Sequence, residues 1–245
     1  MPSKPEITDS VWLRPPRNRG EQPALSREQI VRAAIELLDA EGPAGLSMRR
    51  LGTRLGSGAT SVYWYVANKD ELLELAVDEV MGEVYVPEPG DTGWRVGASI
   101  FITGMRAMLL RHPWVLGLLG VRPNLGPNAM RMGERTIALL SASGFSPMEI
   151  AHASSLLMSH AIGSATMVSA ALHRTRESGL SIEQQMEQLK PYLDRVAAEH
   201  PHYDRWRQEV GPSTSDPERV WEESFTFGLE RLLDGLDSWL ARRER

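Results

Sequence analysis

Residues 46–69, LSMRRLGTRLGSGATSVYWYVANK, decide the fold of this chain. Ser47 can cap a short helix whose apolar residues recur at the three- and four-residue spacing of one helical face. Three small residues, 56–58, then permit a sharp reversal of the chain, and a helical pattern resumes at Thr60. Two short helices around a glycine turn are typical of a helix-turn-helix.

The second of these helices presents polar and aromatic side chains to one side. At about 100° per residue, inward-facing Val62 and Val66 leave five side chains outward or on the flanks, namely Thr60, Ser61, Trp64, Tyr63 and Tyr65. Residues 46–69 hold four basic residues and no acidic one, although the whole chain has a net charge of -5. Such confined positive charge suits phosphate binding. Aromatic residues beside valines also suit a packed core, so the pattern alone leaves both roles open.

Residues 45–73 carry a motif that resembles the DNA-binding segment of the tetracycline-repressor (TetR) family. Its pattern is Gly-Leu, a short helix, Leu-Gly, four variable residues, and a close ending in Asn-Lys-x-x-Leu-Leu. The matching residues are Gly45, Leu46, Leu51, Leu55, Gly56, Val62, Tyr63, Trp64, Val66, Asn68, Lys69, Leu72 and Leu73. The resemblance implies a DNA-reading head in which residues 57–60 and Tyr65 set the operator sequence.

We expect eight side chains of this segment to contact DNA. Arg49 lies near the start of the first short helix, and its planar guanidinium can donate two hydrogen bonds to one guanine edge. The outward polar side chains can reach the groove, and the tyrosines and the lysine can reach phosphates. The predicted DNA contacts are Arg49, Arg50, Thr60, Ser61, Tyr63, Trp64, Tyr65 and Lys69.

The chain of 245 residues is long enough for a small head and a larger body. Its 42% hydrophobic and 24% charged residues are ordinary for a globular protein. It has no cysteine, which excludes disulfides and fits the reducing cytoplasm. Residues 1–24 hold five prolines and no long apolar run, which predicts a disordered arm rather than a signal sequence. The pattern leaves open whether this arm contacts DNA.

Start and stop signals predict an all-α fold in two domains. A three-helix helix-turn-helix domain covers residues 25–69, and a larger helical effector-binding and dimerisation domain covers residues 70–245. No stretch alternates with the period of a strand. Capping boxes start helices at Ser26, Ser146, Ser181 and Ser215.

Asn68 caps a helix that connects the head to the body. We expect this connecting helix to run to about residue 86 and to be closed by Pro87 and Pro89. In the body, residues 127–142 form a helix whose inward side chains are Met130, Ile137 and Leu140. Pro191 interrupts or restarts a later helix, and residues 200–216 form a loop.

The helix that starts after Ser146 has no charged residue from 150 to 173. Three histidines, five serines and a threonine make this run too polar for a membrane, so we expect it to be buried in protein. The last helix carries apolar residues at alternating steps of three and four. We expect both helices to pair with their copies as a four-helix bundle, or else to form the core of one subunit. The predicted homodimer interface is Leu156, Ala161, Phe225, Leu229, Leu232, Leu236 and Trp239.

Catalysis has little support in the sequence. Ser159 and His160 are neighbours on a helix and therefore point in different directions, and no phosphate-binding glycine loop is evident. His200, His202 and Asp204 have too little context for a metal site. We expect no enzyme activity, no catalytic residue, no metal and no cofactor.

The body also resembles the tetracycline-repressor subgroup, in His112-Pro-Trp and in residues 120–123, 144–146 and 227–230. Over about residues 25–240, the resemblance implies that a small amphipathic effector enters the body, moves the connecting helix and spreads two heads. Candidate ligand-binding residues are Phe101, Met105, Met108, Trp114, Leu118, Met130, Glu134, Met158, His160 and Met167. Tetracycline itself is not expected, because Glu83 to Tyr85, Phe101 and Leu118 replace the family's drug- and magnesium-binding residues.

The predicted function is a cytoplasmic, ligand-responsive transcriptional regulator. As a dimer it represses from a near-palindromic double-stranded DNA operator, from which the effector releases it. Three alternatives stay open: an activator, a ligand-binding helical protein that does not bind DNA, and a protein-interaction module without a pocket.

Overall fold

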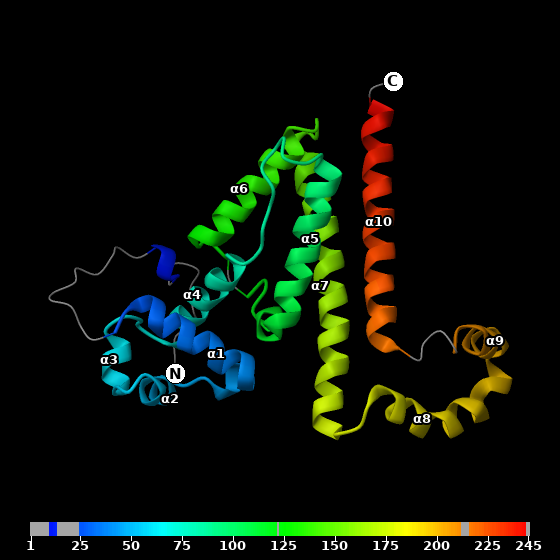
Figure 1. Cartoon of the computed structure of the whole chain (residues 1–245), viewed down its shortest axis with the longest axis horizontal. Coiled ribbons are helices and arrows are strands. Elements are labelled where there is room, and N and C mark those ends of the chain that lie inside the picture. The colour runs from blue at the N-terminus through cyan, green and yellow to red at the C-terminus, as the bar shows by residue number, and fades with distance from the viewer. Residues whose placement is uncertain (1–9, 14–24, 122, 212–215, 244–245) are drawn as a thin grey trace. The chain divides into compact units, whose positions relative to one another are not determined.

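The structure is a computed structural model that describes residues 10–13, 25–121, 123–211 and 216–243. Over these ranges it contains ten α-helices and no strand, which confirms the predicted all-α fold (Figure 1). Residues 1–154 and 155–245 form two compact units. The α-helices are α1 (Arg27–Gly45), α2 (Met48–Arg54), α3 (Ala59–Tyr63), α4 (Lys69–Met81), α5 (Trp94–Arg111), α6 (Pro127–Ser141), α7 (Pro147–Ser178), α8 (Ile182–Val196), α9 (Pro201–Val210) and α10 (Pro217–Arg243).

Helices α1, α2 and α3 form the head. The predicted capping box starts α1, since Ser26 Oγ accepts from the Gln29 N–H at 3.1 Å and Gln29 Oε1 accepts from the Ser26 N–H at 2.8 Å. Gly42, with a φ of 68°, ends the regular part of α1, and one more turn follows to Gly45. Fully buried apolar side chains fill the core of the head, among them Ile30, Leu38, Leu51, Val62 and Val66.

Helix α4 starts where the sequence predicted, because Asn68 Oδ1 accepts from the Glu71 N–H at 2.8 Å. It ends earlier than expected, at the C-cap residue Gly82 rather than near residue 86. The prolines at 87 and 89 therefore do not end it. The N–H of Gly82 donates to the carbonyl oxygens of Asp78 and Glu79 in the last turn of α4. Val84 and Val86 are buried in the segment that follows.

Helix α4 also holds the start of α6. The Asp78 carboxylate, only 2% exposed, accepts from the N–H groups of Asn128 at 3.2 Å and Ala129 at 3.0 Å. The Asn128 side-chain amide donates back to the Asp78 carbonyl oxygen at 2.9 Å. Gly126 allows this approach, because a Cβ there would lie 2.1 Å from the Asp78 carboxyl carbon. A single buried carboxylate thus caps α6 from α4.

Helices α5 and α6, the 3-10 helix η3 (Pro113–Gly117) and the start of α7 also belong to the first unit. The buried face of α5 is apolar and includes Phe101, Ile102, Met105, Met108 and Leu109. On α6, Leu140 is buried as expected. The expectation for Met130 and Ile137 is wrong, since both are exposed. They lie seven residues apart on one face of α6, whereas Thr136, Leu139 and Leu140 form the buried face.

The second unit contains most of α7 and all of α8, α9 and α10. Helices α7 and α10 run antiparallel and side by side (Figure 1). His160 Nε2 on α7 donates to the Phe225 carbonyl oxygen on α10 at 2.9 Å, and the two rings stack with centroids 5.0 Å apart. Gly228 lets the ring approach, because a Cβ there would lie 2.4 Å from it. We call this antiparallel pair of helices the α7–α10 hairpin. Its two helices contact each other through His160.

Residues 201–210 form helix α9, so the predicted loop over 200–216 is wrong there. Pro201 takes the first helical position, where a missing N–H costs nothing. Arg207 then pairs with Asp204 at 3.0 Å and with Asp194 of α8 at 2.9 Å. Helix α8 has the predicted Ser181–Gln184 capping box and continues through Pro191 rather than breaking there.

Two other helix starts differ in detail from the predicted boxes. At α7 the Glu149 carboxylate accepts from both the N–H and the hydroxyl of Ser146 at 2.8 Å. At α10 the Asp216 side chain accepts from the Arg219 N–H at 3.1 Å, whereas Ser215 lies outside the described residues. In each case a carboxylate stabilises the first turn of the helix.

Helix α7 is long and apolar enough to cross a membrane by length and composition, with a mean hydropathy of 1.3 over 18 residues. Core helices of soluble proteins pass the same test, and the histidines within α7 would be costly in hydrocarbon. Only 22% of that window is buried within the single chain. Most of this window is therefore at least partly exposed in the described chain, where the sequence predicted burial in protein.

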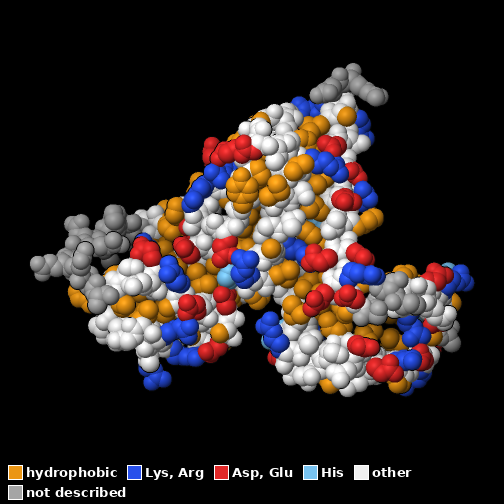
Figure 2. Space-filling view, viewed as in Figure 1, with side chains coloured by type: hydrophobic (Ala, Val, Ile, Leu, Met, Phe, Trp, Pro, Cys, Tyr) orange, Lys and Arg blue, Asp and Glu red, His pale blue; other side chains and the backbone are white. Residues whose placement is uncertain are grey.

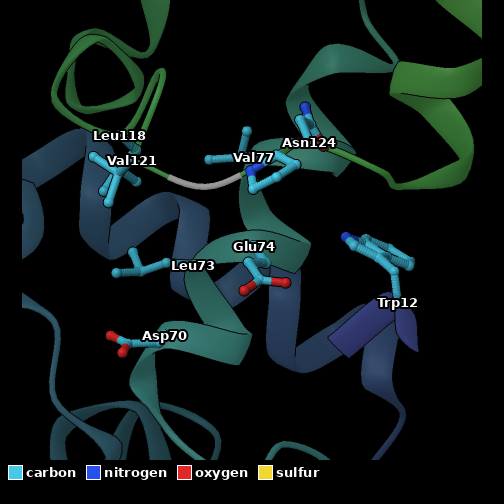
Figure 3. Close-up of a pocket in the computed structure, with 9 residues that line it drawn as sticks. Trp12, Asp70, Leu73, Glu74, Val77, Leu118, Val121 and Asn124 are labelled. Carbon is cyan, nitrogen blue, oxygen red and sulfur yellow. The ribbon is translucent and has the colours of Figure 1, made fainter. Parts of the chain in front are cut away.

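Within the predicted arm, residues 10–13 are described and lie against α4, where Trp12 and Glu74 line one pocket (Figure 3). They form a single 3-10 turn, η2 (Val11–Leu13). Ser10 Oγ donates to Glu74 Oε2 at 2.7 Å, and the Val11 N–H donates to the same oxygen at 3.1 Å. The other residues of the predicted arm, 1–9 and 14–24, lie outside the described residues.

Candidate nucleic-acid interface and effector-binding body

The turn between α2 and α3 brings the two short helices close together. Gly56 adopts a φ of 65°, which favours glycine. Gly52 lies against the start of α3, where an added Cβ would come within 2.9 Å of the Ala59 nitrogen. Val62 of α3 and Val66, which follows it, are fully buried in the core of the head.

The opposite side of α3 is open to solvent. Trp64, which follows the last residue of α3, is 76% exposed, and Tyr63 and Thr60 are also exposed. Ser61 is half-buried at the edge of this face. We call Thr60, Ser61, Tyr63 and Trp64 the reading face. An exposed indole beside hydroxyl groups can stack on and hydrogen-bond to a ligand.

Helix α2 carries three arginines, at 49, 50 and 54. Lys and Arg side chains lie among acidic ones over the lower left of the molecule, where α1 to α3 lie (Figure 2). Arg50 is held by Glu41 of α1 through two hydrogen bonds, one of them 2.6 Å long, and also donates to the Gly45 carbonyl oxygen at 2.9 Å. The side-chain hydrogen bonding between Arg50 and Glu41 lowers the pKa of the Glu41 carboxyl and raises the pKa of Arg50. Arg54 pairs with Glu36 at 2.6 Å. Among the described residues, the exposed Arg49 guanidinium has no hydrogen-bond or ion-pair partner.

Two further predicted contacts are held by the head itself. Lys69 Nζ donates to the Pro43 carbonyl oxygen at 2.6 Å, and the Tyr65 hydroxyl donates to the Leu25 carbonyl oxygen. Sequence reasoning missed the acceptors Glu36, Glu41, Pro43 and Leu25. All of them come from α1 or its flanks, and no local pattern shows which α1 residue faces which residue of α2 or α4.

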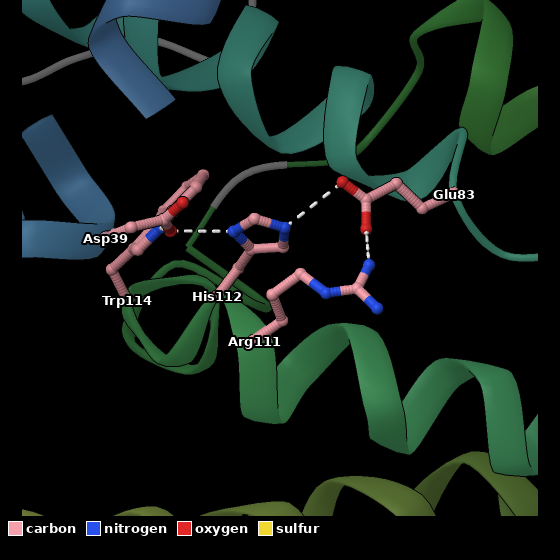
Figure 4. A network of polar contacts seen from close by, with 5 residues as sticks. All are labelled: Asp39, Glu83, Arg111, His112 and Trp114. Atoms are coloured by element: carbon pink, nitrogen blue, oxygen red, sulfur yellow. Dashed lines mark hydrogen bonds and ion pairs between the residues drawn. The ribbon is translucent and has the colours of Figure 1, made fainter. Parts of the chain in front are cut away.

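A polar network joins the head to the end of α5 (Figure 4). His112 is 3% exposed, with Nδ1 2.6 Å from Asp39 Oδ1 of α1 and Nε2 3.1 Å from Glu83 Oε1. Trp114 Nε1 donates to the same Asp39 oxygen at 2.7 Å, and Arg111 pairs with Glu83. No sequence pattern pairs His112 with Asp39, because 73 residues separate them.

The predicted ligand-binding residues fall into both units. In the first, Phe101, Met105 and Met108 are buried on one face of α5 and Trp114 is buried in η3. Leu118 is half-buried, and Met130 and Glu134 on α6 are exposed. In the second unit, Met158 and His160 are half-buried and Met167 is 73% exposed. The structure thus brings together the three α5 residues, and His160 contacts Phe225 of α10.

The predicted dimer residues also divide by burial. Ala161, Phe225 and Leu229 are buried within the α7–α10 hairpin, and Leu233, which the seam did not include, is buried with them. Leu232 and Leu236 are half-buried, and Leu156 and Trp239 are exposed. Phe227, which the predicted interface also did not include, is exposed on α10. The hairpin therefore keeps an apolar outer surface.

Comparison with known proteins gives consistent matches along the chain. Residues 30–76 match the model for bacterial regulatory proteins of the tetR family, and residues 86–240 match the tetracyclin repressor-like C-terminal domain. The HTH-type transcriptional repressor DrrR1 of Streptomyces coeruleorubidus is 35% identical over 228 residues, covering 92% of this chain and 82% of its own. An HTH-type transcriptional regulator of Saccharopolyspora erythraea is 41% identical over 165 residues, 67% of this chain and 70% of its own.

Solved structures agree with these matches. ActR of Streptomyces coelicolor, crystallised in complex with actinorhodin, aligns with a TM-score of 0.67 at 33% sequence identity. The alignment covers 87% of this chain and 99% of that chain.

Proposed function

Because the chain belongs to the tetracycline-repressor (TetR) family of bacterial regulatory proteins, we propose that it represses transcription as a dimer that a small molecule releases from DNA. The family is non-enzymatic, which confirms the expectation that the chain is not an enzyme. Its place of action is the cytoplasm, where the operator DNA lies.

The observation that carries the proposal is the exposure of the reading face. In a head that served only as a packed domain, Trp64 and Tyr63 would be buried with Val62 and Val66. Instead the aromatic side chains are open to solvent, and the exposed Arg49 guanidinium on α2 has no hydrogen-bond or ion-pair partner among the described residues. Arg49 reads a base edge, and the reading face enters the major groove.

A homodimer accounts for the apolar outer surface of the α7–α10 hairpin. Leu156, Met167, Phe227 and Trp239 are exposed, and Leu232 and Leu236 are only half-buried. A second hairpin packed on the first would cover these side chains and give a four-helix bundle. Two heads related by a two-fold axis then meet half-sites about 34 Å apart, or at a spacing related by helical turns.

The effector class follows from the relative that was crystallised with its ligand. ActR binds actinorhodin, and we propose a flat polycyclic aromatic effector for this chain. Met105, Met108 and Phe101 lie on the buried face of α5, and such polarizable, adaptable side chains could repack around aromatic rings. Tetracycline fits less well, since Phe101 and Leu118 stand where its polar and magnesium-binding residues are expected.

Two links can carry effector binding to the head. Asp78 ties α4 to the start of α6, and His112 ties the end of α5 to α1 through Asp39. A shift of α5 or α6 around an effector would therefore pull on both α4 and α1. The heads of the dimer would then move out of register with successive half-sites.

Fluorescence anisotropy of the full chain on duplex DNA from upstream of its own coding sequence tests the proposal. We expect binding that weakens steeply with salt, is lost when Trp64 and Arg49 are both changed to Ala, and is reversed by actinorhodin. Folding of the variant is checked by circular dichroism. Ligand binding by a chain that does not bind DNA would favour the non-DNA-binding alternative, and DNA binding without sequence specificity would contradict the proposed operator.

A further inference from the structure

Two carboxylates of α1 are paired with two of the arginines on α2. Arg50 donates to both carboxylate oxygens of Glu41, one of these hydrogen bonds being 2.6 Å long. It also donates to the Gly45 carbonyl oxygen at 2.9 Å. Arg54 donates to Glu36 Oε2 from Nε at 3.2 Å and from the terminal nitrogen at 2.6 Å. Both guanidinium groups are therefore held by α1 through more than one hydrogen bond.

The two pairs lie on one side of α2. Arg50 and Arg54 are four residues apart, so they share a face of the helix, and their partners show that this face is turned toward α1. Arg49 lies about 100° away from Arg50 around the helix axis and has no hydrogen-bond or ion-pair partner among the described residues. The fold thus divides the arginines of α2 into two that are paired and one that is not.

The exposed side of α2 is where DNA phosphates are expected. In a helix-turn-helix the first helix of the motif crosses the DNA backbone, while the second enters the major groove. Cations on that first helix attract any duplex, because phosphates carry no sequence information directly. An arginine beside a carboxylate adds less to this attraction, since the carboxylate balances its charge and is itself repelled by phosphates. The two pairs therefore reduce the attraction of α2 for DNA of any sequence.

We propose that Glu36 and Glu41 are specificity-determining residues, which restrain sequence-independent DNA binding by holding Arg54 and Arg50 away from phosphates. Arg49 then remains the arginine of α2 that is available to a base edge. The inference rests on the proposed function, because it concerns how the chain binds DNA. It also gives Arg50 another role than the predicted DNA contact, namely holding α2 against the end of α1.

The effect of each pair on DNA affinity should be modest. Residues 46–69 hold four basic residues and no acidic one, but Glu36 and Glu41 precede this stretch and reach it through the packing of α1 on α2. The side chains of both pairs are about half exposed, and exposed ion pairs are weak. The carboxylates therefore lower the affinity for DNA without abolishing it.

The salt dependence of binding to a random-sequence duplex tests the inference on the full chain. Each further phosphate that the protein neutralises steepens the plot of log affinity against log salt by about 0.9. We expect Glu36→Gln combined with Glu41→Gln to steepen this slope and to raise the affinity by about two- to fivefold for each released pair. Fluorescence anisotropy measures both quantities.

Operator affinity should rise less than random-duplex affinity in this double variant. Base contacts fix the register of the head on the operator, so the released arginines meet only the phosphates that lie within reach there. On a random duplex the head can shift until both arginines meet phosphates. The ratio of operator affinity to random-duplex affinity should therefore fall.

Matched variants separate pairing from net charge. Glu79→Gln removes the same charge from an exposed position on α4 and measures the effect of net charge alone. In a chain that already carries Arg50→Ala, Glu41→Gln should raise affinity no more than Glu79→Gln does, because no arginine remains to be released. Arg54→Ala with Glu36→Gln gives a second, independent cycle. Circular dichroism checks folding, and each single Glu variant replaces the double variant if the latter is misfolded.

A gain no larger than that of Glu79→Gln, or a gain by Glu41→Gln that persists in full with Arg50→Ala, would overturn the inference. Weaker DNA binding by the Glu variants would overturn it as well, because the pairs would then support the DNA-binding shape of the head. In all three cases a wild type that still binds its operator leaves the proposed function intact. A wild type that binds no duplex at low salt would instead contradict the repressor, and the inference with it.

Discussion

Nδ1 of His112 lies 2.6 Å from Oδ1 of Asp39, and this contact joins the end of α5 to α1 of the head. Both nitrogens of the buried ring are engaged, because Nε2 meets Glu83. The ring is therefore fixed between two elements that should move differently when an effector binds.

His112→Phe tests this link, since it keeps a ring but removes both nitrogens. We expect a loss of about 0.5–1.5 kcal/mol of unfolding free energy, because the buried ring loses its hydrogen bonds, whereas the Asp39 and Glu83 carboxylates remain about one third exposed to water. Effector-driven release of DNA should weaken as well, measured by anisotropy. His173→Phe is the control, because His173 is exposed and pairs with Glu177 of its own helix. Unchanged release in His112→Phe would mean that the link does not transmit the signal.

Asp78→Ala should destabilise the first unit by about 1–3 kcal/mol, because the N–H groups of Asn128 and Ala129 lose their acceptor. Urea denaturation measures the change. Glu79→Ala, an exposed carboxylate on the same helix, should leave stability almost unchanged. If the two variants lose equal stability, the Asp78 cap of α6 does not matter energetically.

Arg49→Ala should weaken specific DNA binding by about 1–3 kcal/mol and relax discrimination at one base position. Its stability should stay near the wild-type value, since Arg49 has no partner in the described chain. Arg54→Ala is the comparison, because Arg54 is already paired with Glu36. Equal weakening of Arg49→Ala on every sequence tested would assign Arg49 to phosphate rather than to a base.

The Glu41–Arg50 pair predicts a pH dependence with a definite sign. Arg50 holds the pKa of Glu41 below its ordinary value of 4.5. The pair therefore stabilises the fold above the pKa of the unfolded carboxyl, and this contribution is lost as pH falls through the lower folded pKa. The stability difference between wild type and Glu41→Gln should shrink from about pH 7 to about pH 3 in urea denaturation. A difference that grows on acidification would contradict the assignment.

Leu232→Glu combined with Leu236→Glu should give monomers in analytical ultracentrifugation, because charge would enter the proposed four-helix bundle. Ser238→Glu, exposed on the same helix, is the control. A dimer that survives the double change would place the interface elsewhere on the chain.

Local signals in the sequence predicted most helix starts. Ser26, Asn68 and Ser181 cap their helices as expected, because a capping hydrogen bond joins residues three apart. Helix α9 was missed for the opposite reason. Pro201 suggests a loop, yet proline is also favoured at the first helical position. The ion pair between Arg207 of α9 and Asp194 of α8 joins residues too far apart for any local pattern to predict.

Contacts between distant elements could not be predicted in the same way. The sequence placed Trp64 and Val62 on opposite sides of a short helix, as the structure has them. It could not show that Glu41 holds Arg50, or that Ser10 meets Glu74 across 64 residues. Each of these pairs depends on how two helices or segments pack, which periodicity within one segment does not determine.

Selection of operators from a random duplex library by the full chain tests the reading face most directly. The wild type should enrich a near-palindrome whose half-sites lie about one helical turn, or a multiple of it, apart. Trp64→Ala should enrich no such sequence while remaining folded and dimeric. Failure of the wild type to enrich any symmetric site, or full enrichment by Trp64→Ala, would contradict the reading of DNA by Thr60, Ser61, Tyr63 and Trp64.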